Sequence, residues 1–468
     1  MSHSFEWSSE FPASPEQLFG YHANPGAIDR LIPPWERITI LRRGASIDVG
    51  AEVVLQQRLG PLRLKWLARH TNLDAPRSFQ DTQISGPFAF WQHDHLIEAV
   101  DEERSRLRDR IRFDLPWAPL SNIALPMVRS MLRRMFVYRH ETTRRDLELH
   151  DFLAPWVSGR SLRIAITGSS GMIGSRLAAL ASVLGHRVVR IIRPESQSAS
   201  NESGNIGESV VWDRQSGFNR LDAMQDLDAV VHLGGFGIAE RRWTEETKRK
   251  IRSSRIDGTH ALVKSLTDLS SPPKALVCAS GVGIYGDCGD RECLESSPPA
   301  DDFLGQVAKD WEAAARTFES SGGRVAIGRL AMVLHPHQGA LAKMLPLLRW
   351  GLGGRIGNGH QSWSWIHLDD AVAAFLFLAA CPDASGPFNF ASPHGTTNRE
   401  FTRTLARALS RPAWFPAPAP ALRIALGEMA DALLLASTRA VPQRLEQMHF
   451  PFRARRLEDA LAQLLGDA

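Results

Sequence analysis

The sequence predicts an α+β unit followed by an α/β unit built on a parallel sheet. Up to about Phe113, short segments of alternating apolar and polar residues are separated by Gly-Pro and Ala-Pro breaks, which is typical of hairpins in an antiparallel sheet. From Leu162 onward, apolar strands alternate with helical patterns, which is typical of βαβ units. Residues 151–160, with Pro155 and Gly159, are expected to form the linker.

The composition is that of a soluble globular protein of two or three domains. The chain has 468 residues, of which 43% are hydrophobic and 23% are charged. Its net charge of +4 is too small to indicate a nucleic acid partner. The four cysteines form no CxxC pair, and no apolar run reaches the roughly 18 residues that cross a bilayer. We therefore expect a cytoplasmic protein with no disulfide framework, no metal site and no membrane span.

The first unit, residues 1–150, is expected to end in one long helix. Ser14 and Pro15 have the pattern of an N-cap and first helical position, so a short helix begins there. A longer helical stretch runs from about Ile123 to Leu149, and apolar residues recur along one of its faces. We expect this long helix to pack across a curved antiparallel sheet.

This plan resembles the helix-grip superfamily, which includes START-like, SRPBCC and polyketide cyclase/dehydrase-type proteins. The segments that carry the resemblance are Pro33–Glu36, Gly86–Phe88 and Met135–His140. The resemblance covers about residues 1–150 and implies a cavity between sheet and helix that holds an apolar ligand. The alternative is a filled core that serves only for docking.

Two histidines lie in one expected strand of this unit. His93 and His95 flank Asp94, so their side chains should point to the same face of the sheet. A metal pair needs a third ligand, and the sequence indicates none. We therefore predict that both histidines line a cavity wall or the surface.

A glycine-rich loop follows the first strand of the second unit. The loop comprises Thr167, Gly168, Ser169, Ser170, Gly171, Met172, Ile173 and Gly174. Gly168 would permit the tight turn, Gly171 the close approach of a pyrophosphate, and Gly174 the packing of helix on strand. The phosphates would face the unpaired N–H groups at the helix N-terminus. The sequence therefore predicts an α/β Rossmann unit that binds a dinucleotide.

The end of the next strand favours NADP(H) over NAD(H). An acidic residue there would bond the ribose 2′-hydroxyl of NAD, but the strand ends in Arg193, which can pair with the 2′-phosphate of NADP. The alternative is that Arg193 is simply solvated. Ser169 can add a hydroxyl contact. A later strand ends in Leu233, Gly234 and Gly235, which we expect along the adenosine side of the cofactor.

The second half as a whole resembles the epimerase-type atypical short-chain dehydrogenases/reductases, the NAD-dependent epimerase/dehydratase type. The segments that carry the resemblance are the glycine loop, Val231–Gly235, Arg242–Thr244, Ile251–Thr259, Ala279–Gly286, Lys309–Glu312, Gly339–Met344 and Ser364–Asp370. The resemblance covers residues 161–468. It implies an NAD(P)-binding Rossmann domain over residues 161–410, and a small helical domain over residues 411–468. A helix-grip domain ahead of this module is a known arrangement in the family.

The resemblance also implies a serine and a Tyr-x-x-x-Lys pair, in which the tyrosine exchanges a proton with the substrate. Aligned on Glu312, the chain has Leu304 at the tyrosine position and Ala308 at the lysine position. A shift by one residue, which uses Lys309, places Gly305 at the tyrosine position. The pair is missing in either register, so standard carbonyl reduction or sugar epimerisation is in doubt.

Three residues are candidates for an altered catalytic set. Ser280 is the upstream serine in one register, while Gly281 takes its place in the other. Arg255 stands where the fold usually has a structural asparagine. Tyr285 follows the Ser280 strand and could replace the missing tyrosine if a cation, Arg255 or Lys343, lowered its pKa. The alternative is that Tyr285 packs near the nicotinamide or the substrate.

The substrate side is expected to lie further along the chain. Lys343, Arg355 in a glycine-rich segment, and Trp363 are the candidates there, and the segment suits a lid over a flat or anionic ligand. An ordinary surface loop is the alternative. Asp369 and Asp370 precede an apolar run, where we expect them to favour the helix dipole.

The function that these features predict is an NADP(H)-binding oxidoreductase or epimerase-like enzyme acting on an unknown small molecule. Its N-terminal unit would bind an apolar ligand. The rival prediction is a catalytically silent NADP(H)-responsive sensor, because the usual catalytic pair is missing. We expect no nucleic acid partner and leave a homodimer open.

Overall fold

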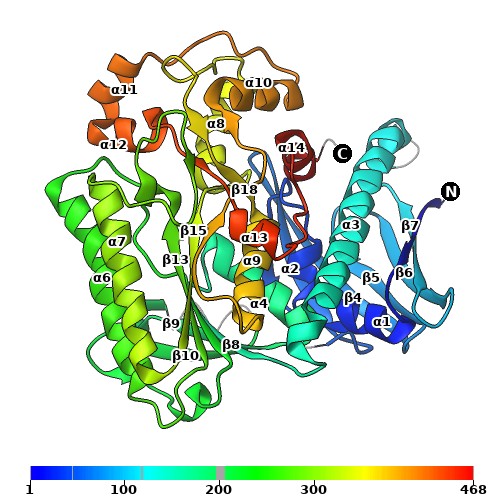
Figure 1. The fold of residues 1–468 in the computed structure, drawn as a ribbon. Coiled ribbons are helices and arrows are strands. Elements are labelled where there is room, and N and C mark those ends of the chain that lie inside the picture. Colours follow the sequence, from blue (N-terminus) through cyan, green and yellow to red (C-terminus); the bar gives the residue numbers. More distant parts are fainter. Residues whose placement is uncertain (1, 45, 118–119, 197–205, 467–468) are drawn as a thin grey trace.

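The structure is a computed structural model that describes residues 2–44, 46–117, 120–196 and 206–466. One long helix, α3 (Leu125–Val157), runs between an antiparallel sheet near the N-terminus and a mainly parallel sheet (Figure 1). None of the described helices is both long enough and apolar enough to cross a membrane.

The antiparallel sheet has seven strands in the order β1-β7-β6-β5-β4-β3-β2. Their bounds are β1 His3–Phe11, β2 Ile38–Arg42, β3 Glu52–Leu59, β4 Leu62–Asp74, β5 Ser78–Ser85, β6 Phe90–Ala99 and β7 Ser105–Asp114. Side chains of β7 alternate between buried and more exposed, as expected for a sheet with one covered face. On that face Ile111 and Phe113 pack with Leu132 and Phe136 of α3. The predicted helix-grip architecture is confirmed.

Two short helices connect β1 to β2. In α1 (Pro15–Ala23), Ser14 is the N-cap, and a capping box with Gln17 satisfies backbone N–H groups that would otherwise be unpaired. Helix α2 (Ala27–Leu31) follows and packs against both α3 and the second half of the chain.

Helix α3 is longer than the sequence pattern indicates. It continues through most of residues 151–160, the expected linker, and ends at Ser158, which has the left-handed φ of +51°. Leu153 and Val157 are buried in the core of the parallel sheet. Pro155 normally interrupts a helix, but here burial of the neighbouring apolar side chains outweighs the lost backbone hydrogen bond.

The second sheet has eight strands in the order β11-β10-β9-β8-β12-β13-β15-β19, and only β11 runs antiparallel to its neighbour. Their bounds are β8 Arg163–Thr167, β9 Arg187–Ile192, β10 Glu208–Asp213, β11 Gly217–Phe218, β12 Ala229–His232, β13 Ala275–Gly281, β15 Arg324–Leu330 and β19 Gly386–Phe390. The order reverses between β8 and β12, which makes their carboxyl ends the expected binding crevice. The predicted Rossmann fold is confirmed.

Helices cover both faces of this sheet. Helices α6 (Glu245–Thr267) and α7 (Phe303–Arg316) lie on one face, and α4 (Met172–Val183) and α9 (Leu368–Ala380) lie on the other (Figure 1). The second face also receives α2 and the end of α3, so the N-terminal unit docks onto α4 and α9.

The remaining helices are α8 Gly339–Arg349, α10 Asn398–Ala408, α11 Ala419–Leu426, α12 Glu428–Ala430, α13 Gln443–Gln447 and α14 Leu457–Leu465. Helices α8, α10, α11 and α12 gather above the carboxyl ends of the parallel strands, while α13 packs against β19 (Figure 1). Short strands pair as β14 Glu292–Cys293 with β21 Arg439–Ala440, β16 Met332–Leu334 with β18 Trp365–His367, and β17 Ser362–Trp363 with β20 Thr396–Thr397. A separate core around Trp365, Phe401 and Leu461 holds several of these elements together.

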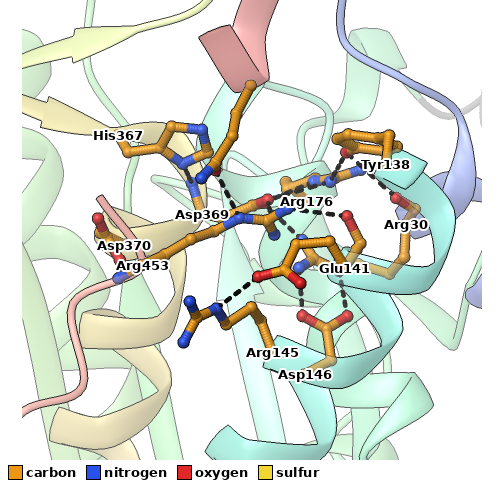
Figure 2. A network of polar contacts seen from close by, with 12 residues as sticks. Arg30, Tyr138, Glu141, Arg145, Asp146, Arg176, His367, Asp369, Asp370 and Arg453 are labelled. Carbon is orange, nitrogen blue, oxygen red and sulfur yellow. Dashed lines mark hydrogen bonds and ion pairs between the residues drawn. The ribbon is translucent and has the colours of Figure 1, made fainter. Parts of the chain in front are cut away.

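A buried ion network joins the two halves of the chain (Figure 2). Asp369, at the start of α9, accepts hydrogen bonds from Arg30 at 2.7 Å, Arg176 at 2.8 Å and Arg453 at 2.9 Å. Arg30 is only 1% exposed and also binds both carboxylate oxygens of Asp146 on α3, at 2.5 and 2.8 Å. Burial acts to raise the pKa of Asp369, but the three arginines outweigh it and hold that pKa well below its usual range.

Asp369 and Asp370 were expected to interact with the helix dipole. That expectation is incomplete, because both carboxylates also have specific buried partners. Both are buried, and the Asp370 carboxylate accepts the backbone N–H groups of Arg453 and Ala454 at 2.6 and 3.1 Å. The partners lie far away in sequence, so a local pattern cannot indicate them.

We predict that Asp146→Asn lowers the free energy of unfolding by about 3–5 kcal/mol, since it leaves Arg30 buried with an incomplete set of partners. Urea denaturation followed by circular dichroism measures the effect. Glu148→Gln, two residues along the same helix, is the control. The side chain of Glu148 pairs with Arg145 and is 40% exposed. Its loss should therefore lower the free energy of unfolding by less than about 0.5 kcal/mol. Equal effects of the two variants would contradict a structural role for the buried pair.

Candidate functional site

The glycine loop joins β8 to α4 at the point where the strand order reverses. Gly168 has a φ of +65°, and a Cβ there would lie 3.2 Å from the backbone of Leu233. A Cβ on Gly174 would lie 2.2 Å from the carbonyl oxygen of Gly168, so no larger residue fits. Gly171 is the N-cap of α4 and supplies no side-chain cap, which leaves the first N–H groups of the helix facing the loop.

A chain of buried polar side chains supports the loop from behind. Thr167 Oγ1 lies 2.7 Å from His232 Nδ1 and accepts the backbone N–H of Leu233 at 3.0 Å. On its other side His232 Nε2 lies 3.1 Å from Thr259 Oγ1, which accepts a hydrogen bond from Trp311 at 2.9 Å. Burial lowers the pKa of His232 to about 4, so the ring is neutral near pH 7. The ends of β8 and β12 are thus fixed side by side.

Two side chains, one in the loop and one after the next strand, have the chemistry to contact a cofactor. Ser169 is buried, and its hydroxyl has no hydrogen-bond partner among the described residues. Arg193 follows β9 directly, its side chain is 76% exposed, and the carboxylate of Glu195 lies 3.9 Å away. An unpaired buried hydroxyl and an accessible guanidinium both suit a phosphate-bearing ligand. Ser170, Met172 and Ile173 complete the loop and the first turn of α4.

Arg255 holds the connection between β12 and α6. Its guanidinium donates to the carbonyl of Phe236 at 2.9 Å and lies 5.1 Å from the ring centroid of Trp311. It also lies 3.4 Å from the position of a Cβ on Gly235, an ordinary van der Waals distance. Burial lowers the pKa of Arg255 to about 10. The residue therefore positions the Gly234-Gly235 segment.

Ser280 and Tyr285 belong to one buried network at the end of β13. Ser280 donates to Glu312 at 2.9 Å, and both Glu312 oxygens accept from Arg329 at 2.8 Å. Arg329 also donates to the Tyr285 hydroxyl at 2.9 Å, and that hydroxyl donates to Asn389 at 2.6 Å. The network fixes every one of these side chains.

The cation beside Tyr285 is Arg329, so the expectation that Arg255 or Lys343 supplies it is wrong. Arg255 is committed to the Phe236 carbonyl, and Lys343 donates to the carbonyl of Ala239. Arg329 does not make Tyr285 a stronger acid either. Burial dominates and raises the pKa of Tyr285 to about 12, although the charge of Arg329 acts in the opposite direction.

Of the expected substrate-side residues, Lys343 and Arg355 are exposed, whereas Trp363 is buried. Arg355 is exposed and donates to the carbonyls of Gly357 and Asn358 in its own loop, the latter at 2.8 Å. Trp363 is only 9% exposed and packs edge-on against Phe401 in the core of the C-terminal helices. This core position argues against a direct substrate contact for Trp363.

The N-terminal unit contains the cavity that its architecture implies. The cavity measures about 260 Å³ and lies between the antiparallel sheet, α2 and α3. Most of its wall is apolar, with Trp66, Phe88, Trp91 and Met135 among the lining residues. His93 and His95 do line it, and Asp81 from the neighbouring strand faces them. The prediction that the two histidines line a cavity wall is confirmed, and Asp81 is a third possible ligand that the sequence did not indicate.

Comparisons with known proteins agree with this geometry. An epimerase family protein of Mycobacterium leprae is 40% identical over 305 residues, which cover 65% of this chain and 96% of that protein. Residues 164–391 match the NAD dependent epimerase/dehydratase family. The chain belongs to that family. Residues 11–136 match the polyketide cyclase/dehydrase and lipid transport family, and residues 417–464 match a domain of unknown function.

Solved structures of the epimerase family share the fold. A nucleoside-diphosphate sugar epimerase from Corynebacterium glutamicum is 28% identical, with a TM-score of 0.78 over 99% of this chain and 90% of that chain. A human epimerase family protein solved with NADPH is 31% identical, with a TM-score of 0.59 over 66% of this chain and all of that chain. The match to the Corynebacterium structure covers both sheets, so that protein also carries both units in one chain.

The structure shows what surrounds the residues of the register aligned on Glu312. The side chain of Leu304 lies 3.2 Å from where a Cβ on Gly283 would lie. Ala308 is buried in a small apolar cluster with Tyr285. In that register, apolar contacts surround both positions. The sequence contained one sign of the network around Tyr285, because Arg329 is a charged residue inside an apolar strand.

We predict that Tyr285 does not ionise below about pH 11, because burial raises its pKa to about 12. Phenolate absorbance near 295 nm, titrated in the wild type and in Tyr285→Phe, measures this directly. The two curves should coincide below pH 11. A phenolate step near neutral pH that disappears in Tyr285→Phe would contradict the prediction and restore Tyr285 as an acid/base.

Proposed function

We propose that this epimerase-family protein is an NADP(H)-dependent oxidoreductase or epimerase-like enzyme that acts on a small molecule. The observation that carries the proposal is the glycine loop. Gly168 and Gly174 leave no room for a Cβ, and the uncapped N-terminus of α4 is open to a pyrophosphate. When bound, the nicotinamide would supply or accept the hydride.

Each part of the loop has a proposed role in holding the cofactor. The first N–H groups of α4 and the Ser169 hydroxyl would bind the pyrophosphate. Leu233, Gly234 and Gly235 would lie along the cofactor at the end of β12, with Arg255 fixing their path. Arg193 would bind the 2′-phosphate, and the NADPH in the human relative supports this preference.

We predict that Arg193→Ala raises the NADPH dissociation constant about 10- to 100-fold and leaves that of NADH nearly unchanged. A hydrogen bond to a charged group contributes about 1.5–3 kcal/mol, which corresponds to that range. Fluorescence titration of the purified protein with each cofactor provides both constants. Arg187→Ala is the control, because Arg187 is exposed at the opposite end of the same strand. A wild-type preference for NADH, or failure to bind either cofactor, would overturn the cofactor proposal.

The substrate would bind at the carboxyl ends of β12 and β13. Ser280 is proposed to face the nicotinamide while Glu312 fixes its hydroxyl. Tyr285 would act as a neutral residue that keeps the β13 loop in place, since Arg329 and Asn389 hold its hydroxyl. Lys343 and Arg355 are exposed cations above this edge, and we propose them as contacts for an anionic substrate group.

The N-terminal unit is proposed to bind an apolar ligand in its cavity. The aromatic and aliphatic side chains of the wall favour an apolar molecule, and the match to polyketide cyclase and lipid transport proteins supports this. Helix α2 lines this cavity and also packs on α4, which begins at the cofactor loop. A ligand in the cavity could therefore influence the cofactor site through two packed helices.

A second function is favoured by the Tyr285 network. Because the Tyr-x-x-x-Lys pair is missing in either register and Tyr285 is held neutral, the protein could serve as a catalytically silent NADP(H)-responsive sensor. In that case the cofactor state would change the affinity of the N-terminal cavity for its ligand.

We predict that carbonyl compounds oxidise bound NADPH, or that nucleotide sugars reduce bound NADP⁺, and that Ser280→Ala lowers the rate at least tenfold. Loss of one positioned hydrogen bond near the reacting atoms accounts for that magnitude. Stopped-flow absorbance follows the reaction. Ser320→Ala, an exposed serine on the far turn after α7, should leave the rate unchanged. If none of these compounds reacted, the result would support the function as a sensor.

A further inference from the structure

The cavity of the N-terminal unit contains a cluster of histidines and carboxylates that the cofactor chemistry does not use. The strand register explains how the cluster assembles. Asp81 on β5 pairs directly with His93 on β6, and His95 on β6 pairs directly with Asp109 on β7. His93 and Asp109 are 3% and 2% exposed. Three neighbouring strands thus bring four titratable groups together on the face that lines the cavity.

Three of these groups converge like ligands of one metal ion. Asp81 Oδ2 lies 3.4 Å from His93 Nδ1 and 3.6 Å from His95 Nε2. One ligand atom from each residue lies within 4.8 Å of the other two. A Zn²⁺ ion binds His nitrogen and carboxylate oxygen at roughly 2.0–2.2 Å, so its ligand atoms stand roughly 3–3.6 Å apart. Both Asp81 distances already fall in that range.

Asp109 orients both histidines from the opposite side. His93 Nε2 lies 2.8 Å and His95 Nδ1 2.7 Å from the same Asp109 oxygen, and His140 Nε2 lies 2.6 Å from its other oxygen. A carboxylate beside the far nitrogen of a histidine orients the ring, as the partners of metal-ligating histidines do. The contacts with Asp109 therefore hold both rings with their other nitrogens toward Asp81.

We propose that Asp81, His93 and His95 bind one divalent transition-metal ion whose remaining positions open into the cavity. Two imidazoles and one carboxylate suit Fe²⁺, Co²⁺ or Zn²⁺, and three protein ligands leave positions for a further ligand. Since the cavity wall is largely apolar, the matching ligand is an apolar molecule with one oxygen donor, such as a carboxylate or an enol, that coordinates the ion. Asp109 is a positioning residue that fixes the two rings.

The test is a Co²⁺ titration of the full-length protein after treatment with a chelator. We expect one ion per chain and visible d–d absorption of nitrogen- and oxygen-coordinated Co²⁺. Asp81→Asn, His93→Gln and His95→Gln should each weaken binding at least tenfold and alter the spectrum. Asp109→Asn should weaken it about 10- to 100-fold, as expected for a residue that orients ligands.

Two controls keep the proposal falsifiable. His22→Gln and His70→Gln alter histidines that line the same cavity outside the three-residue group, and they should keep the wild-type affinity and spectrum. Circular dichroism and the thermal transition establish that each variant is folded, and the NADPH titration reports separately on the second unit. Wild-type protein that binds no Co²⁺, or binding that survives His93→Gln and His95→Gln in folded protein, would overturn the proposal.

Discussion

The buried carboxylate of Asp369 is the interaction on which the arrangement of the two halves depends. Ions removed from water cost several kcal/mol each, so they are tolerated only with close partners. Here the partners come from α2, α4 and the segment before α14, which supply Arg30, Arg176 and Arg453. Asp146 on α3 completes the set through Arg30 (Figure 2). No one of these elements can move away without leaving a charge unpaired.

This network also links helix α4 to the cavity of the N-terminal unit. Arg176 lies on α4, one turn after the glycine loop, and donates to the carbonyl of Asp29 on α2 at 2.5 Å and to the Tyr138 hydroxyl on α3 at 2.6 Å. Helices α2 and α3 form part of the cavity wall. The helix that begins at the glycine loop is therefore held by residues of the two helices that line the cavity. Such a connection offers a physical route by which one site could sense the other.

The parallel sheet contains a second buried ion pair with a different consequence. Arg329 neutralises Glu312, and the two hold Ser280 and Tyr285 in fixed positions. The usual chemistry of the family needs a tyrosine that exchanges a proton. In this chain, burial keeps the phenol of Tyr285 neutral.

Local patterns in the sequence determined the glycine loop, the βαβ alternation and the shared face of His93 and His95. Each depends on residues within a few positions of one another, where backbone geometry alone decides the outcome. Only the tertiary structure decided that α3 continues to Val157, that Asp81 and Asp109 flank the histidines, and that Asp369 is paired with arginines. Strand register and burial bring those groups together. Both arise from contacts between distant segments, such as Arg30 and Asp369, which are 339 positions apart.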